Sequence, residues 1–541
     1  MLEVFLFPEQ GENLPQQVEK KINVNENYHR LFDESKSDER ERQIDDEAEM
    51  KMPNYPSTSL LADEKLEQQV DPRRWYALAV ILLPILLNSL NTYMIQVALP
   101  SIQNSLNASF SDAQLIVTGF SLSLAVALIV SGKLGDIYGR KRLLLIGVSG
   151  FTLMAMLGGL TSNPTLLIAI RIVQGLAAAL IQPQVLSMMQ VNFLPQEKGL
   201  VFSVYGALLG FGFAFGLILG GILVHWNGFD LGWRTVFFFN VPFGILVLLC
   251  LPILPESRGR RTQSIEWIGT VLIVSGLFLL VYPLSEGQKQ GWPLWIWGCL
   301  ILSLLLLLAF IVVEIRKQKR GGAPLVDLTI FKQRLFRVGM TSVVLIYLSM
   351  FSFFFILTYY LQFGLHYDAQ ATSLAFLPLG SGFFLTSLLS SRIVSRWGVV
   401  VLKIGALVTG ICCFLFVVLL HIDAIHLLHI RYIVLLLVYG LGLGLVTTPL
   451  TRVILGTVPI KDAGTGSGLF NTCMYLANSL GVALISILFS ASLRQSLASA
   501  VLSDYVRAFS ASLTASGGLA LAAFVCLCFL RDRQEKLTER Q

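Results

Sequence analysis

Long apolar runs divide most of the chain into similar segments separated by short polar breaks. Between residues 75 and 530 these runs are each about 20 residues long, the length that a helix needs to cross a bilayer core of about 30 Å. We count about fourteen such runs. Their cores are 75–98, 113–132, 142–161, 164–188, 199–224, 233–253, 265–284, 294–315, 337–361, 371–391, 399–420, 430–455, 467–490 and 508–530. The pattern predicts an all-α polytopic membrane protein with an even number of spans.

Lys and Arg side chains gather in alternate loops between the predicted spans. The basic loops carry Lys133, Arg140, Lys141 and Arg142, then Arg258, Arg260 and Arg261, then Arg316, Lys317, Lys319, Arg320, Lys332 and Arg334. The alternate loops 99–112, 162–163 and 362–370 contain no Lys or Arg. Because cytoplasmic loops retain basic residues, we expect both termini in the cytoplasm.

Composition excludes a water-soluble fold, because 54% of the 541 residues are hydrophobic and only 14% are charged. The first 70 residues are the exception, with 17 Asp and Glu against 8 Lys and Arg. That segment has no apolar run of the signal-peptide kind, so we expect an acidic, disordered cytoplasmic tail. The seven cysteines fall inside apolar runs without disulfide or zinc spacing, and neither a metal nor a cofactor is expected.

Glycines concentrate in two of the predicted spans. The fifth span contains Gly206, Gly210, Gly212, Gly216, Gly220 and Gly221, and the twelfth contains Gly440, Gly442 and Gly444. In lipid, helices associate through close packing at small residues, and such faces also allow helices to slide or rock. We therefore predict that Gly212, Gly216, Gly220 and Gly221 are helix-packing positions.

A charged turn, residues 132–142, joins the second and third spans and reads GKLGDIYGRKR. Its glycines allow the helix ends to approach closely, and its acidic and basic side chains can pair across the turn. It resembles the hallmark loop of the major facilitator superfamily, G-x-L-[AG]-D-x-x-G-R-[KR]-x. The resemblance implies a conformational latch that closes in the outward-facing state. The residues that match this latch are Gly132, Asp136, Gly139, Arg140 and Lys141.

Three further segments are similar to one branch of that superfamily, the fourteen-span EmrB/QacA-type drug:proton antiporters. Residues 171–175 resemble its R-x-x-Q-G segment and provide Arg171, Gln174 and Gly175 as transport or coupling candidates. Residues 233–244 resemble its W-R-x-x-F-x-x-N-x-P-x-G segment, and residues 462–483 resemble the segment that leads into the thirteenth span. The resemblance implies the major facilitator fold, which is two six-helix halves with the substrate cavity between them. It also implies a place in the cell (inner or plasma) membrane.

The same resemblance, with the polar breaks, divides the chain into five parts. We expect an N-terminal tail over 1–70 and an N-terminal six-helix half over 71–255. An inserted helix pair with a cytoplasmic linker follows over 256–325, then a C-terminal six-helix half over 326–530 and a short cytoplasmic tail over 531–541.

Two departures from the branch pattern bear on proton coupling. Asn91 occupies the place of an acidic residue in the first span, and an amide cannot titrate at physiological pH. Leu217 replaces the proline of the branch's fifth-span motif, so the associated helix bend is in question. A scan of the predicted spans for another carboxylate finds only Glu266 and Glu314, both near a membrane edge. We keep Asn91 as a transport or coupling candidate.

Polar residues inside spans are candidates for the cavity. Arg171 has no acidic partner in the sequence, so it either favours anionic or zwitterionic substrates or lies in a cage of carbonyls and amides. Neutral hydrogen bonds are expected from Asn88, Gln96, Gln182, Asn240 and Asn471, while Tyr360 and Gln362 match the branch's Y-L-Q segment. The cluster of His421, Asp423, His426 and His429 has no known metal-ligand spacing and is assigned no function.

These observations predict a transporter that exports small molecules of drug-like or amphipathic character by alternating access, with proton antiport left open. The alternative is an uncoupled facilitator or carrier for anionic or zwitterionic solutes. No catalytic constellation for an enzyme and no folded sensor domain is found in the sequence. The expected partners are a small-molecule substrate, the lipid bilayer and, under antiport, protons; nucleic acid is not among them.

Overall fold

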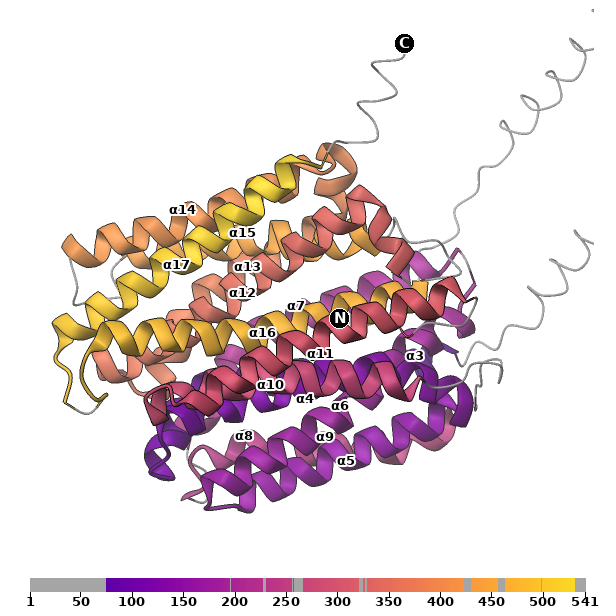
Figure 1. Cartoon of the computed structure of the whole chain (residues 1–541), viewed down its shortest axis with the longest axis horizontal. Helices are drawn as coiled ribbons and strands as arrows, with labels where there is room; N and C mark the ends of the chain where they lie inside the picture. The colour runs from indigo at the N-terminus through magenta and orange to yellow at the C-terminus, as the bar shows by residue number, and fades with distance from the viewer. Residues whose placement is uncertain are drawn as a thin grey trace, which may run out of the picture. The chain divides into compact units, whose positions relative to one another are not determined.

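A computed structural model provides the fold (Figure 1). It describes residues 74–194, 196–226, 230–254, 256, 266–320, 325, 328–422, 430–455, 463–497 and 499–530. The described residues are almost entirely helical. The long helices are α3 (Arg74–Ser105), α4 (Phe110–Tyr138), α5 (Arg140–Leu160), α6 (Pro164–Asn192), α7 (Lys198–Trp226), α9 (Asn240–Cys250), α10 (Trp267–Gln290), α11 (Leu294–Lys319), α12 (Arg334–Tyr359), α13 (Ala369–Trp397), α14 (Val400–Ile422), α15 (Ile430–Leu455), α16 (Ala463–Leu493) and α17 (Leu502–Cys528), and the short α8 covers Arg234–Phe238.

The prediction of fourteen spans is confirmed, since the described helices include fourteen that are long and apolar enough to cross a membrane. One of them, Arg234–Ile253, is built from α8 and α9 together. Pro242 explains the break, because it lacks an N–H and its ring would clash with the carbonyl of Phe238 in a continuous helix. The predicted tails 1–70 and 531–541 lie outside the described residues, as do Asp423, His426 and His429.

The helices form two six-span halves with an inserted pair, as expected. The N-terminal half comprises α3 to α9, and the C-terminal half comprises α12 to α17 (Figure 1). The halves meet chiefly where α7 packs on α13 and where α4 packs on α16. Helices α10 and α11 pack on each other, and α10 also contacts α4 and α16 at the boundary of the two halves.

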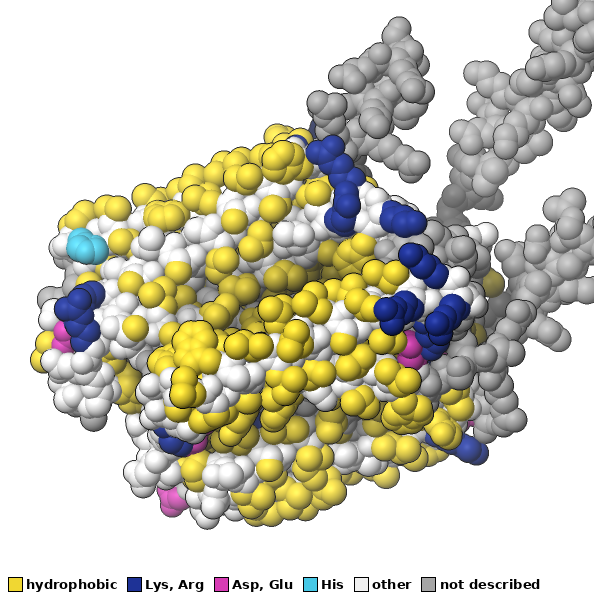
Figure 2. Space-filling model, viewed as in Figure 1, with side chains coloured by type: hydrophobic (Ala, Val, Ile, Leu, Met, Phe, Trp, Pro, Cys, Tyr) yellow, Lys and Arg dark blue, Asp and Glu magenta, His cyan; other side chains and the backbone are white. Residues whose placement is uncertain are grey.

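The spans alternate in direction, so the charged turn between α4 and α5 marks one side of the bundle, called here the turn side. The other side is called the opposite side. Figure 2 shows hydrophobic side chains over the middle of the visible face and Lys and Arg gathered near its ends. On α11 the exposed side chains include Ile301, Leu304, Leu305 and Leu308. An apolar belt between charged ends is what a bilayer requires.

Helix α7 uses its glycines to approach its neighbours closely. A Cβ on Gly216 would lie 2.9 Å from Cβ of Tyr93, and one on Gly212 would lie 2.6 Å from Cβ of Ser89. A Cβ on Gly221 would overlap the carbonyl oxygen of Ala369 in α13, across the boundary between the halves. Helix α7 runs without interruption from Lys198 to Trp226, and the buried Leu217 replaces the proline that would have removed a backbone donor there.

Candidate substrate site between the two halves

A group of amides and tyrosines joins the halves inside the bundle. It is called here the amide–tyrosine cluster, and its members are Asn88 of α3, Gln182 of α6, Tyr205 of α7, and Asn471 and Tyr475 of α16. The amide nitrogen of Gln182 donates to the amide oxygen of Asn471 at 3.0 Å and to the hydroxyl of Tyr205 at 3.3 Å. The hydroxyl of Tyr475 donates to the amide oxygen of Gln182 at 3.4 Å and accepts from Asn88 at 3.3 Å.

This cluster brings together three residues that were predicted separately from the sequence, Asn88, Gln182 and Asn471. Its two tyrosines were not predicted. Tyr475 follows Asn471 by four residues, so both lie on one face of α16. This spacing could have identified Tyr475 from the sequence. No carboxylate or basic side chain takes part in these hydrogen bonds. The cluster is therefore a neutral, largely buried hydrogen-bond network to which both halves contribute.

Aromatic rings extend the cluster across the boundary between the halves. Tyr93 of α3 meets Phe213 of α7 edge-on, with ring centroids 4.9 Å apart. It lies parallel to Phe351 of α12 at 6.1 Å, and Phe351 in turn stacks near Tyr347. Flat apolar compounds pack favourably against such rings.

Asn91, Gln96 and Asn240 lie elsewhere in the N-terminal half, and each side chain is at most 1% exposed. Asn240 donates to the carbonyl of Val236 at 2.9 Å and to the amide oxygen of Asn91 at 3.5 Å. The amide nitrogen of Asn91 and both amide atoms of Gln96 have no hydrogen-bond partner among the described residues. Buried polar atoms of this kind are normally satisfied by water or by a ligand, so both residues stay candidates.

Arg171 is held inside the N-terminal half by a cage of neutral groups. Its side chain is 1% exposed and donates to the carbonyl of Ile116 at 3.1 Å and to the amide oxygen of Gln174 at 2.7 Å. The guanidinium also lies 4.1 Å from the ring centroid of Phe120. A Cβ on Gly175 would overlap the carbonyl oxygen of Phe120, so α6 and α4 touch at this level. Of the two alternatives left open by the sequence, the geometry favours the carbonyl and amide cage.

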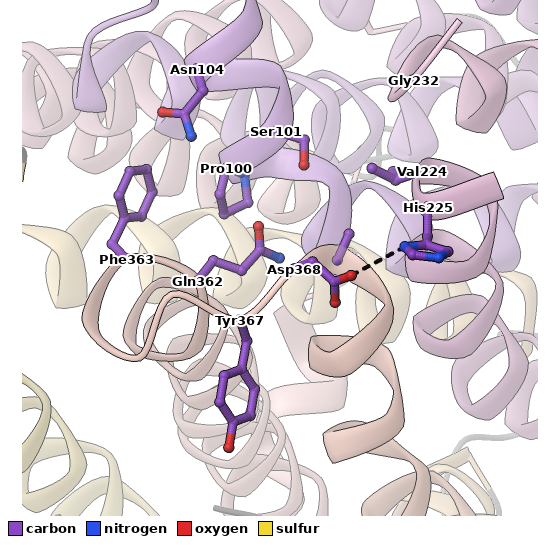
Figure 3. Close-up of a pocket in the computed structure, with 11 residues that line it drawn as sticks. Pro100, Ser101, Asn104, Val224, His225, Gly232, Gln362, Phe363, Tyr367 and Asp368 are labelled. Carbon is purple, nitrogen blue, oxygen red and sulfur yellow. Dashed lines mark ion pairs between the residues drawn. The ribbon is translucent and has the colours of Figure 1, made fainter. Parts of the chain in front are cut away.

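On the opposite side, polar contacts connect the two halves. The hydroxyl of Tyr359 donates to Gln103 at 2.8 Å, and the amide of Gln362 donates to the carbonyl of Val97 at 2.9 Å. His225 of α7 pairs with Asp368 before α13 at 3.1 Å, and both line a pocket of about 520 Å³ (Figure 3). Other residues of its lining are Pro100, Ser101, Asn104, Phe363 and Tyr367. These contacts join the two halves on this side of the bundle.

Tyr360 and Gln362 were expected together at the cavity, and the structure separates them. Residues Tyr360–Gly364 form a single π-helical turn at the end of α12, which shifts the register of the side chains there. Tyr360 stacks on Phe509 of α17 at 4.4 Å, within the C-terminal half. It is Tyr359 and Gln362 that reach the N-terminal half.

The charged turn is tied to its own half. Asp136 and Arg140 form an ion pair at 2.9 Å, and the ammonium of Lys141 donates to the carbonyls of Leu254 and Pro252 at 2.6 and 3.0 Å. Gly139 has φ +104°, and a Cβ there would lie 2.8 Å from the carboxylate of Glu256, so this position requires glycine. A Cβ on Gly132 would lie 3.9 Å from Pro183 of α6. The five predicted latch residues thus occupy one structured turn, and their latch role stays a prediction.

Comparison with known proteins agrees with this architecture. The family model of the Major Facilitator Superfamily matches residues 81–482. The chain belongs to the major facilitator superfamily. Its proteins are transporters, and an enzymatic activity is not indicated. Similar curated proteins include a probable actinorhodin transporter of Streptomyces coelicolor, which is 31% identical over 77% of this chain and 72% of its own length.

Other relatives are named for drug resistance or have known structures. Puromycin resistance protein pur8 of Streptomyces alboniger is 32% identical over 77% of this chain and 82% of its own length. Among solved structures, a bacterial homologue of the lysosomal transporter Spinster, captured inward-facing, has a TM-score of 0.60 at 16% identity, covering 84% of this chain and 96% of that one. At this identity the structural likeness shows the fold.

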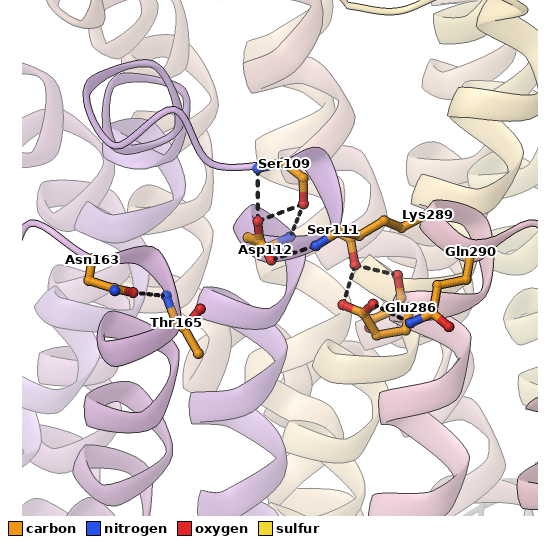
Figure 4. Close-up of polar contacts among 9 residues, drawn as sticks. Ser109, Ser111, Asp112, Asn163, Thr165, Glu286, Lys289 and Gln290 are labelled. Carbon is orange, nitrogen blue, oxygen red and sulfur yellow. Dashed lines mark hydrogen bonds and ion pairs between the residues drawn. The ribbon is translucent and has the colours of Figure 1, made fainter.

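The described spans contain two buried carboxylates that the sequence scan missed, Glu286 of α10 and Asp504 of α17, so that scan was wrong. Helix α10 continues to Gln290, past the predicted end at 284, and Glu286 is only 7% exposed. Ser111 of α4 donates to Glu286 at 3.0 Å, and Gln290 donates to it at 3.1 Å (Figure 4). These partners satisfy the polar end of α10 and allow the helix to extend.

We expect Arg171→Met to lower stability while leaving substrate preference unchanged, because Arg171 connects α4 and α6 within one half of this major facilitator chain. Hydrogen bonds made by a charged donor are worth about 1.5–3 kcal/mol each. Thermal unfolding in detergent should therefore show a clear fall in Tm. Arg337→Met is the control, since Arg337 is an exposed arginine near the start of α12. An unchanged Tm with selective loss of organic-anion transport would contradict this role.

Proposed function

We propose that this transporter exports amphipathic, drug-like small molecules across the plasma membrane by alternating access, with both termini in the cytoplasm. The main support for this function is the amide–tyrosine cluster, in which side chains of both halves form hydrogen bonds with Gln182. A substrate that replaces those bonds would release one half from the other. The adjacent aromatic rings suit the apolar part of such a compound.

The relatives support export as the direction of transport. Their names include a tetracenomycin C resistance and export protein of Streptomyces glaucescens and the drug efflux pump JefA of Mycobacterium tuberculosis. The basic loops on the turn side support a cytoplasmic location for that side. A carrier for anionic solutes is supported less well, because the Arg171 guanidinium is buried inside one half and already donates to a carbonyl and an amide oxygen there.

Transport by purified protein in proteoliposomes tests this function. The panel contains lipophilic cations, neutral drugs and organic anions, each measured with and without an imposed pH gradient. We expect flux of neutral and cationic amphipathic compounds. Flux of organic anions alone would replace this proposal with the carrier alternative. Uphill flux that requires the gradient would establish proton antiport, whereas downhill flux that ignores it would establish a facilitator.

Alternating access predicts that the opposite side must open during transport. In a cysteine-depleted background, His225→Cys combined with Asp368→Cys should be cross-linked by a short bifunctional thiol reagent, because the native side chains lie 3.1 Å apart across the two halves. We expect the cross-link to block export. Samples without the reagent should export normally, and reductive cleavage of the cross-link should restore export. Each single variant serves as control. Full export after complete cross-linking would contradict opening at this side.

A further inference from the structure

A mixed-charge cluster lies at the turn-side end of the inserted helix pair, away from the proposed substrate site. It contains Glu266 at the start of α10, Glu314 and Lys317 of α11, and Lys133 of the charged turn. Glu314 is fully buried, and Glu266 is 6% exposed. An apolar floor formed by Phe310 and Leu325 lies nearby, with Leu272, Phe331 and Leu469 packed against it. Two carboxyl groups are thus buried at the junction of the two halves and the inserted pair.

The two carboxyl groups are close neighbours. A Cβ on Gly269 would lie 2.6 Å from Oε1 of Glu314 and 3.4 Å from Oε2 of Glu266. A side-chain hydrogen bond joins Glu266 and Glu314. A hydrogen bond between two carboxyl groups requires a proton on one of them, because ionised carboxylates only accept. The geometry therefore holds one proton between two glutamates.

The remaining contacts decide which glutamate carries that proton. Lys317 pairs with Glu266 at 3.1 Å, and the backbone N–H of Leu325 donates to Glu266 at 2.9 Å. Burial raises the pKa of Glu266, but hydrogen bonds with Glu314, Lys317 and Leu325 and the charge of Lys317 outweigh it and lower the pKa below its usual value. These contacts stabilise the ionised form of Glu266, which leaves Glu314 as the group to carry a shared proton.

Lys133 connects this pair to the charged turn. Burial lowers the pKa of Lys133, and Glu266, Lys317 and Glu314 all act on it electrostatically. It lies next to Gly132 and three residues before Asp136 of the predicted latch. With the proton on Glu314 the four side chains sum to one positive charge, and without it they are neutral. Loss of the proton therefore strengthens the attraction between Lys133 and the inserted pair.

We propose that Glu314, paired with Glu266, is a proton-binding site. Its protonation state sets how strongly the inserted helix pair attracts Lys133 of the charged turn. On release, the O–H bond of Glu314 breaks, the proton passes to water on the turn side, and the new carboxylate is balanced by Lys133 and Lys317. Lys317, whose side chain is 32% exposed, leads from the pair to that water. The inference rests on the proposed export function and adds a response to turn-side pH.

The test uses proteoliposomes in which the orientation of the protein is known. Transport flux is measured while the pH is changed on one side of the membrane at a time. The protonated fraction of one group falls about tenfold across two pH units centred on its pKa. We expect wild-type flux to follow turn-side pH, and Glu314→Gln and Lys133→Met to lose this response. Glu286→Gln is the matched control, because Glu286 is a buried carboxylate of the same inserted pair on the opposite side, bonded to Ser111 (Figure 4).

Infrared difference spectroscopy after a pH step gives a second readout that does not need transport. We expect a protonated-carboxyl stretch that responds to pH in wild type and in Glu286→Gln but is missing in Glu314→Gln. Persistence of that band in Glu314→Gln, or an unchanged flux response in both Glu314→Gln and Lys133→Met, would overturn the proposal. If wild type transports none of the panel yet shows the band, the export function fails while the proton site stands.

Discussion

Gln182→Leu is expected to reduce transport of the preferred compounds at least about tenfold, because this side chain connects both halves through the amide–tyrosine cluster. The substitution leaves Asn471, Tyr205 and Tyr475 without their shared partner. A buried polar group without a partner costs about 1–3 kcal/mol, and about 1.4 kcal/mol corresponds to a tenfold change in affinity. Binding titrations and initial rates in proteoliposomes would measure both effects.

Two variants separate a binding role from a general loss of structure. Tyr475→Phe keeps the ring but removes the hydroxyl that bonds Gln182 and Asn88, so its loss of affinity should be smaller. Gln190→Leu changes an exposed amide of α6, the helix that also carries Gln182, and should transport like wild type. If Gln182→Leu retains wild-type rates for every compound in the panel, the cluster is not the substrate site.

Gly220→Val is expected to destabilise the protein strongly. A Cβ on Gly220 would lie 2.6 Å from the carbonyl oxygen of Met94 and 2.9 Å from its Cα, so the new side chain would push directly on the α3 backbone. Overpacking of this kind costs about 1–3 kcal/mol, and a backbone cannot move aside as a flexible side chain can. Thermal unfolding and the yield of monodisperse protein in detergent would show the loss.

Gly206→Val provides the matched control in the same helix, because a Cβ there would meet nothing within 4 Å. The two substitutions add the same atoms to α7 and differ only in what those atoms contact. We therefore expect Gly206→Val to keep a Tm near that of wild type. Equal losses in the two variants would mean that glycine acts through the helix itself and not through its contact with α3.

The branch pattern suggests a titratable residue in the first span, at the position of Asn91, but the candidate groups for proton coupling in this protein lie elsewhere. Asn91 lies in the core of the N-terminal half beside Asn240 and has no titratable group to offer. Two buried carboxyl groups, Glu266 and Glu314, lie together at the turn-side end of the inserted pair, whereas the buried carboxyl groups of Glu286 and Asp504 lie at the opposite side. Coupling through the turn-side end of the inserted pair would act on the charged turn without passing through the proposed substrate site.

The sequence alone was enough to predict the architecture. Spans of about 20 apolar residues require no tertiary information, since the cost of exposing backbone polar groups to lipid imposes helices of that length. The charged turn and its neighbouring segments also indicated the superfamily before any contact was known. The end of α10 was misjudged because its polar residues are satisfied by Ser111, a partner 175 positions away from Glu286.

Only the tertiary structure decided which polar residues meet. Asn88, Gln182 and Asn471 looked equivalent to Asn91 and Gln96 in sequence, because each is an isolated amide in an apolar run. Contacts such as that between Gln182 and Asn471, which are 289 residues apart, depend on how the two halves dock, and no local periodicity encodes that docking. The same holds for Lys133, whose place near Glu266 and Glu314 follows from the packing of the inserted pair against α4.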